Sequence, residues 1–135
     1  NKIIINKPVL NKIVSSRRAN TKYIYKKLNK ISNNFFNIPK IMKNEVPWRA
    51  NIFFKKEEHR NIILKDLLKK KIRISSWHPS LDLFFEKRKR NLNRFPISDN
   101  LGNKILNIWV NHEINREYLN KIFNYLNYYK KKLVA

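Results

Sequence analysis

Residues 95–126, FPISDNLGNKILNIWVNHEINREYLNKIFNYL, contain in close succession a helix start, an apolar strand and an amphipathic helix. Pro96 followed by Ser98 and Asp99 is typical of a helix N-terminus and predicts a helix over about 98–106. This helix would present three apolar side chains to the core, those of Leu101, Ile105 and Leu106.

The second part of this stretch predicts a strand and a closing helix. The run NIWV, 107–110, is apolar enough for an interior strand. Asn115 can cap a helix over 116–132, because an Asn side chain accepts a hydrogen bond from the first free N–H groups of a helix. That helix has one apolar stripe, formed by Tyr118, Leu119, Ile122, Phe123 and Leu126.

Upstream of residue 95, the spacing of apolar residues alternates between helix and strand. Residues 8–32 and 57–70 follow a helical spacing, whereas 49–55 and 72–75 alternate with a period of two. Residues 81–94 fit either a short helix or an ordered loop. The segment SNNFFNIPK, between the first helix and the first strand, is expected to be a loop because of its Asn pairs and its proline.

These elements predict an α+β domain in which helices pack one small, mostly antiparallel three-stranded sheet. The expected strands lie near 49–55, 72–75 and 107–110, and the packing helices are 8–32, 57–70 and 116–132. The expected core residues are Trp48, Ile52, Phe54, Ile63, Leu67, Ile74, Leu106, Ile108, Ile122 and Phe123.

Length and composition set the class of protein. The 135 residues form one expected domain, 1–135, and the 42% apolar fraction makes a real core feasible. The absence of cysteine excludes disulfides, thiolate metal sites and a Cys nucleophile. No apolar run approaches the ~20 residues that a bilayer span needs. We therefore expect a cytoplasmic protein with no membrane partner.

The net charge of +22 allows two interpretations. A polyanion partner would explain it, and the alternative function is then a basic RNA-binding structural protein of a ribonucleoprotein particle. Compositional drift would explain it equally, because Lys, Asn and Ile make up nearly half of the chain, as in an A+T-rich coding sequence. Binding of nucleic acid through charge stays possible at this point.

Few residues offer chemistry of their own. The single glycine, Gly102, excludes a P-loop and a dinucleotide fingerprint. His59, which we expect to be solvated, and the other two histidines have no metal-ligand spacing. His78 and Asp82 could form an acid–base pair or simply face water. From the residues alone, no catalytic, cofactor-binding or metal-binding residue is predicted.

The corner Ser76-Trp77-His78-Pro79 combines an aromatic, a titratable ring and a rigid proline. Such a combination is found at the rim of a pocket and also in a well-packed turn. Pro79 disfavours helical geometry at His78, so the segment is expected to leave the second strand as extended chain.

The order of these motifs resembles the C-terminal small domain of the DegT/DnrJ/StrS family of sugar aminotransferases. There a short GI-x-T strand leads to a histidine or tryptophan, an aromatic residue, proline and leucine. KIRISSWHPSL, 71–81, takes this place, with Lys71 where the family usually has glycine. The family's FP-V-A-E helix start, VL-x-LP strand and closing helix correspond to 95–126. RRANTKYIYKKL, 17–28, is similar to the helix that leads out of the family's large domain.

The resemblance implies a pyridoxal phosphate enzyme that transfers an amino group to a keto sugar on a nucleotide, usually as a homodimer. The family's cofactor lysine lies in a large N-terminal domain that residues 1–135 do not contain. We therefore expect a severed or separately encoded small domain, inactive and without pyridoxal phosphate when alone. Its expected partners are a nucleotide-sugar substrate and either the missing large domain or a homodimer partner.

The resemblance also gives the corner a role. Ser76, Trp77 and His78 would line the substrate cleft from the small domain and contact the sugar. The histidine common in the family is replaced by Trp77, and His78 stands where an aromatic residue is usual. A substrate-binding role, and no catalytic one, is therefore expected, with Trp77 only partly buried on an exposed loop after the second strand.

Overall fold

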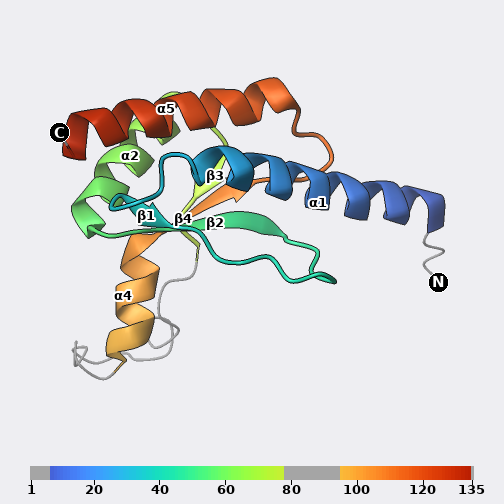
Figure 1. Cartoon of the computed structure of the whole chain (residues 1–135), viewed down its shortest axis with the longest axis horizontal. Coiled ribbons are helices and arrows are strands. Elements are labelled where there is room, and N and C mark those ends of the chain that lie inside the picture. The colour runs from blue at the N-terminus through green and yellow to red at the C-terminus, as the bar shows by residue number, and fades with distance from the viewer. Residues whose placement is uncertain (1–6, 78–94, 135) are drawn as a thin grey trace.

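The computed structural model describes residues 7–77 and 95–134. Helices and strands are mixed along the chain, which runs from a long first helix to a long last one (Figure 1). The elements are α1 (Lys7–Leu28), β1 (Phe36–Asn37), β2 (Arg49–Phe54), α2 (Glu57–Lys69), β3 (Ile74–Ser75), α4 (Pro96–Lys104), β4 (Ile105–Trp109) and α5 (Arg116–Val134). The predicted positions of His78, Pro79, Asp82 and 81–94 lie outside the described residues.

The strands form one antiparallel sheet in the order β1-β2-β4-β3. Strand β4 is central: Arg49 of β2 pairs with Trp109, and Asn51 with Asn107. On the other side of β4, Ser75 of β3 also pairs with Asn107. The α+β class and the three predicted strands are thus confirmed, with shifts of a few residues at their ends.

The fourth strand, β1, corrects the expected loop SNNFFNIPK. Phe36 pairs with Phe54 of β2, and both side chains are buried together with Phe35. The Phe35 ring also packs against His59 of α2 at a centroid distance of 5.5 Å. His59 is consequently buried, and the prediction that it is solvated was wrong. Phe36 and Phe54 from two strands, with Phe35 from the turn before β1, thus anchor this end of the sheet.

The helices α1 and α2 contact one face of the sheet, and α5 packs across both of them (Figure 1). α4 extends away from the sheet, on the side opposite to α5. The core between the sheet and α1, α2 and α5 contains eight of the ten predicted residues, and Phe123 is packed at its border. Trp48 is the exception, because it precedes β2 and is 48% exposed.

The boundary between α4 and β4 also differs from expectation. The helix ends at Lys104, so Ile105 and Leu106 lie in the strand, where Ile105 pairs with Phe53. No residue of α4 is buried, and Leu101 is 47% exposed rather than in the core. Strand pairing of two apolar residues with β2 replaces the last helical turn.

The starts of α4 and α5 have the residues and the hydrogen bond that the sequence predicts. Pro96 occupies the first turn of α4, and the N–H of Tyr118 donates to the Asn115 side-chain oxygen at 2.8 Å. α2 ends in a Schellman arrangement: the N–H of Lys71 donates to Leu68 O and that of Ile72 to Leu67 O. Lys71 adopts φ 55°, the left-handed conformation that favours glycine.

The phenylalanine cluster supports a stability prediction. Phe35→Ala should lower the free energy of unfolding by about 3–5 kcal/mol, because it removes a fully buried ring between two strands and α2. Met42→Ala, at a largely exposed position, should change it by less than about 0.5 kcal/mol. Urea denaturation followed by circular dichroism measures both. Equal small losses would place Phe35 outside the core.

Candidate functional site

The second face of the sheet is formed by the side chains that alternate with the core residues. Ala50, Ile52 and Phe54 of β2 point into the core, so the residues between them point the other way. We use the name second face for the set Arg49, Asn51, Phe53, Ser75, Ile105, Asn107 and Trp109. Its centre is polar, unlike the face under α1 and α2.

Asn107 holds the middle of the second face together. Its side chain is completely buried, and its amide nitrogen donates to the Asn51 side-chain oxygen at 2.8 Å. Its own oxygen accepts a hydrogen bond of 2.7 Å from the backbone N–H of Trp77. A single side chain therefore ties β2, β4 and the chain leaving β3 to one another.

Arg60 holds the same corner from α2. Its Nε donates to the Asn103 carbonyl at the end of α4 at 2.7 Å, and its Nη1 donates to the Ser76 hydroxyl at 3.3 Å. Burial lowers the pKa of Arg60 from its usual value. Ser76 and Trp77 are therefore both held in place. The Arg60 side chain binds the Ser76 hydroxyl, and the Asn107 side chain binds the backbone N–H of Trp77.

The three tryptophans of the chain gather at this corner and the adjacent edge. Trp77 is 60% exposed, and its ring lies 5.8 Å from that of Trp48 at an angle of 54°. The Arg49 guanidinium lies over both Trp48 and Trp109, at 4.4 and 3.2 Å from the ring centroids. An exposed aromatic surface is thus joined to a cation.

The structure places two of the three predicted site residues together. Ser76 and Trp77 lie after β3, and the exposure predicted for Trp77 is confirmed. His78 lies outside the described residues, and the substrate-binding role of all three stays a prediction. Sequence reasoning missed Arg49 and Asn107. A usable signal was present, because Asn51 and Asn107 each interrupt an apolar strand at a side-chain position between core residues.

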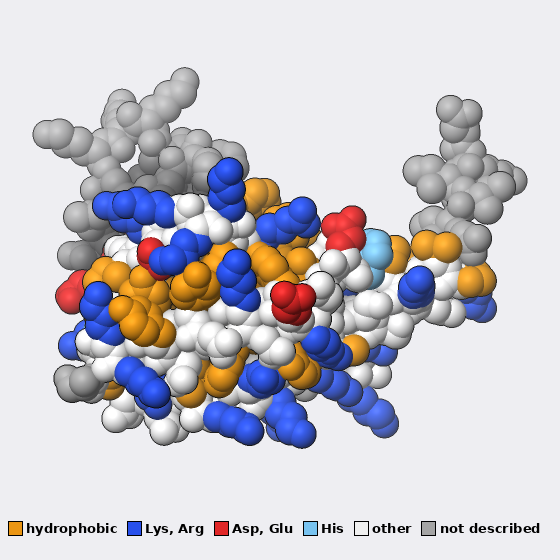
Figure 2. Space-filling model, turned by 90° about the horizontal axis from the view of Figure 1, so that it is seen from above, with side chains coloured by type: hydrophobic (Ala, Val, Ile, Leu, Met, Phe, Trp, Pro, Cys, Tyr) orange, Lys and Arg blue, Asp and Glu red, His pale blue; other side chains and the backbone are white. Residues whose placement is uncertain are grey.

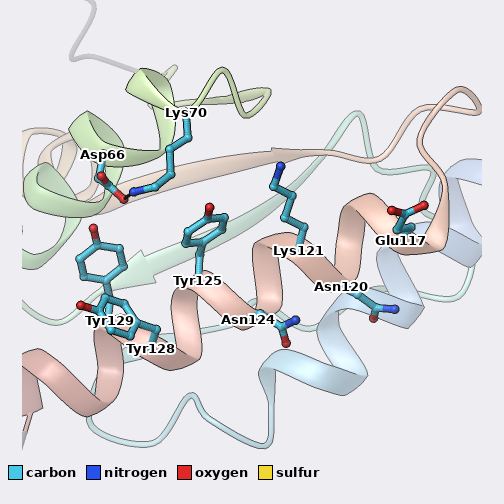
Figure 3. A pocket seen from close by; sticks show the side chains of 9 residues that line it. All are labelled: Asp66, Lys70, Glu117, Asn120, Lys121, Asn124, Tyr125, Tyr128 and Tyr129. Carbon is cyan, nitrogen blue, oxygen red and sulfur yellow. Dashed lines mark hydrogen bonds and ion pairs between the residues drawn. The ribbon is translucent and has the colours of Figure 1, made fainter.

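A groove lies between α2 and α5 (Figure 3). This groove of about 870 Å³ is lined by charged and tyrosine side chains. Asp66 is bonded to Lys70 and Tyr129, which lowers the pKa of the carboxyl. Burial, and then Asp66 itself, raises the pKa of Tyr129 to about 12. Asp66 and Lys70 form an ion pair in this groove. The groove therefore offers fewer unpaired polar groups to a ligand than the second face does.

The basic residues do not converge on the helical side of the molecule. Figure 2 shows Lys and Arg side chains spread over the whole of that face, with apolar groups between them. No helix in the described part of the chain combines the length and the apolar character needed to cross a bilayer. Within residues 7–77 and 95–134, no three metal-binding side chains gather into a site.

The second face does not fit a Schiff base to pyridoxal phosphate. The residues that form it, together with Trp48, Ser76 and Trp77, include no lysine. Arginine, amide, hydroxyl and indole groups can bind and orient a ligand, but none of them condenses with an aldehyde cofactor as a lysine does. The described site is therefore suited to binding rather than to covalent catalysis.

Comparisons with known proteins establish the fold. No protein-family model matches the sequence, and no curated protein matches it. The structure is similar to that of the aminotransferase TlmJ from Streptoalloteichus hindustanus, with a TM-score of 0.77 at 11% identity, over 93% of this chain and 34% of that one. The similarity to a DegT DnrJ EryC1 StrS aminotransferase from Brucella abortus has a TM-score of 0.71 at 14% identity and covers 91% of this chain and 32% of that one. The similarity to the sugar aminotransferase CalS13 from Micromonospora echinospora has a TM-score of 0.63 at 12% identity and covers 87% of this chain and 31% of that one.

These similarities confirm the fold implied by the sequence resemblance. The chain has the fold of one part of these aminotransferases and spans about a third of their length. At such low identity the likeness concerns the fold alone. The activity and the substrates of the whole enzymes are therefore a matter for proposal.

Asn107 provides the first test of the site. Asn107→Leu should leave the Trp77 N–H and the Asn51 amide without their partner, at a cost of about 1–3 kcal/mol in the free energy of unfolding. Amide hydrogen exchange at Trp77 should accelerate more than tenfold. Asn124→Leu, at an exposed position of α5, is the control and should leave this exchange unchanged. Unchanged exchange in Asn107→Leu would contradict the corner's dependence on Asn107.

Trp77 provides the second test. Trp77→Ala should cost less than about 1.5 kcal/mol of stability, because the ring is largely exposed, against about 3–5 kcal/mol for Phe54→Ala in the core. Chemical denaturation followed by far-UV circular dichroism compares the two. A loss of several kcal/mol for Trp77→Ala would make the corner a packing element.

Proposed function

We propose that the chain is the C-terminal small domain of a pyridoxal phosphate-dependent nucleotide-sugar aminotransferase, which transfers an amino group to a keto sugar. The observation that carries this proposal is the similarity of nearly the whole chain to about a third of TlmJ and of CalS13. The motifs of 71–81 and 95–126, which follow the order of the family's motifs, support it independently of the structure.

In this proposal the second face and its aromatic corner point toward the substrate. Ser76, Trp77 and His78 contact the sugar, and the exposed indole of Trp77 offers an apolar surface with a polar edge. Arg60 and Asn107 position this corner through the hydrogen bonds described above. The chain's own contribution is to bind and orient the substrate and to exclude water from it.

Pyridoxal phosphate supplies the electron sink of the reaction when it is bound in the complete enzyme. Its lysine belongs to a large domain, which joins this chain covalently or as a separate partner. The complete enzyme is expected to be a cytoplasmic homodimer. Neither the fold nor the similar structures support the alternative of a ribonucleoprotein component.

The test is cofactor binding by the chain alone. Mixed with pyridoxal phosphate and reduced with borohydride, residues 1–135 should show only weak labelling scattered over many lysines, because no lysine lies at the described site. Mass spectrometry of peptides locates the labels, and an amino-transfer assay should show no activity. Stoichiometric labelling of one lysine would contradict the proposal that another domain provides it.

A positive measurement completes this test. The native protein that contains these residues, isolated from its source with an antibody, should carry pyridoxal phosphate, seen by its absorbance. Trp77→Ala in that protein should mainly reduce kcat/KM for the sugar substrate, with unchanged cofactor content. A native protein without the cofactor would count against the aminotransferase assignment.

A further inference from the structure

Arg49 is a buried cation that packs against two indole rings. The residue is only 7% exposed, and its guanidinium lies over the rings of both Trp48 and Trp109. Stacking of this kind uses the faces of the guanidinium plane and leaves its N–H donors, which point outward in that plane, for other partners. The position of the donors therefore decides what else Arg49 binds.

Those donors lack a partner among the described residues. The Nη1 of Arg49 is buried without a hydrogen bond, and so is the Nε of Arg17 on α1. Arg17 is close enough for its charge, after burial, to lower the pKa of Arg49 further. Within residues 7–77 and 95–134, the ion pairs found are Asp66–Lys70 and Arg73–Glu113, so neither guanidinium has a carboxylate there.

Two other arginines of the fold do have hydrogen-bond partners. Arg18, next to Arg17, donates to the carbonyls of Asn44 and Glu45 at 3.0 Å each. Arg60 donates to a carbonyl and a hydroxyl. A buried charge without a partner is strongly unfavourable, and a second like charge beside it adds repulsion. Arg49 on β2 is such a group, and Arg17 on α1 is a half-buried cation whose Nε also lacks a partner. An anion that binds both arginines would supply the missing partner.

We propose that Arg17 and Arg49 bind the diphosphate group of a nucleotide ligand whose base stacks on the adjoining indole of Trp48. Planar guanidinium groups match phosphate oxygens in paired hydrogen bonds, and two of them match the charge of a diphosphate. Trp48 is 48% exposed and contacts the Arg49 guanidinium, so its indole offers the stacking surface. The nucleotide part of this inference rests on the proposed function, whereas the anion site rests on the two arginines alone.

The experiment uses tryptophan fluorescence, since two of the chain's three tryptophans contact Arg49 and the third contacts Trp48. UDP, pyrophosphate and uridine are titrated separately into the chain. A salt concentration of about 0.15 M screens long-range attraction to the net charge of +22. UDP should produce a saturable change, pyrophosphate should bind more weakly, and uridine should bind more weakly than UDP by about tenfold or more.

Three variants separate the site from general charge. Arg17→Gln and Arg49→Lys should each weaken UDP binding by about tenfold, the second because an ammonium cannot present a paired set of donors. Lys22→Gln removes the same charge as Arg17→Gln from an exposed position of the same helix, and should weaken binding less than about twofold. Should Arg49→Lys fail to fold, as its circular dichroism would show, Arg17→Gln still decides the question.

Each outcome has a definite meaning. No saturable binding of UDP or pyrophosphate, or an equal loss in Lys22→Gln and Arg17→Gln, would overturn the anion site. Equal affinity for UDP and pyrophosphate would support the site with free diphosphate as its source and would overturn the stacking of a nucleotide. None of these results depends on pyridoxal phosphate, so this inference and the proposed function fail by different measurements.

Discussion

The hydrogen bonds of the Asn107 side chain connect the register of the sheet to the shape of the candidate site. Asn107 lies in the central strand between Leu106 and Ile108, which both point into the core. A shift of one residue in β4 would turn the amide into the core and expose both apolar side chains. The register is therefore strongly specified, and with it the place where the Trp77 N–H is held.

The two faces of the sheet are built on different principles. The face under α1 and α2 is a continuous apolar core, in which phenylalanine, isoleucine and leucine side chains exclude water. The second face buries amides and a guanidinium, which stabilise a fold only if each finds a partner. Asn51 and Asn107 do so within the chain, and Arg49 does not. A buried polar group without a hydrogen-bond partner is typical of places where function, rather than stability, has selected the residues.

Periodicity alone predicted the elements that carry long apolar patterns. α1, β2, α2 and α5 were all identified, because a helical or alternating stripe over six or more residues reflects one buried face. The errors occurred where burial depends on a distant segment. Phe36 pairs with Phe54 in a strand of two residues, and His59 is covered by Phe35 from outside its own helix.

The site shows the same limit. Ser76 and Trp77 were identified from the residue types of the corner and from its resemblance to a family motif, both of which are read from a short stretch of sequence. Trp48 was assigned to the core because it continues the alternation of β2, but it lies before the first strand pair and contacts Trp77 instead. The role of Arg49 follows from pairing with Trp109 across the sheet, and no local pattern reveals such a pairing.

The left-handed backbone at Lys71 links the chain's amino-acid composition to its energetics. A side chain with a Cβ in this conformation is disfavoured by roughly 1–2 kcal/mol relative to the ordinary helical region, whereas glycine is not. The only other such position described is Asn33, and the single glycine lies inside α4. In a chain rich in lysine and asparagine and with a single glycine, a lysine thus occupies the left-handed position at the end of α2. The domain carries this strain permanently, and the burial of its apolar core has to offset it.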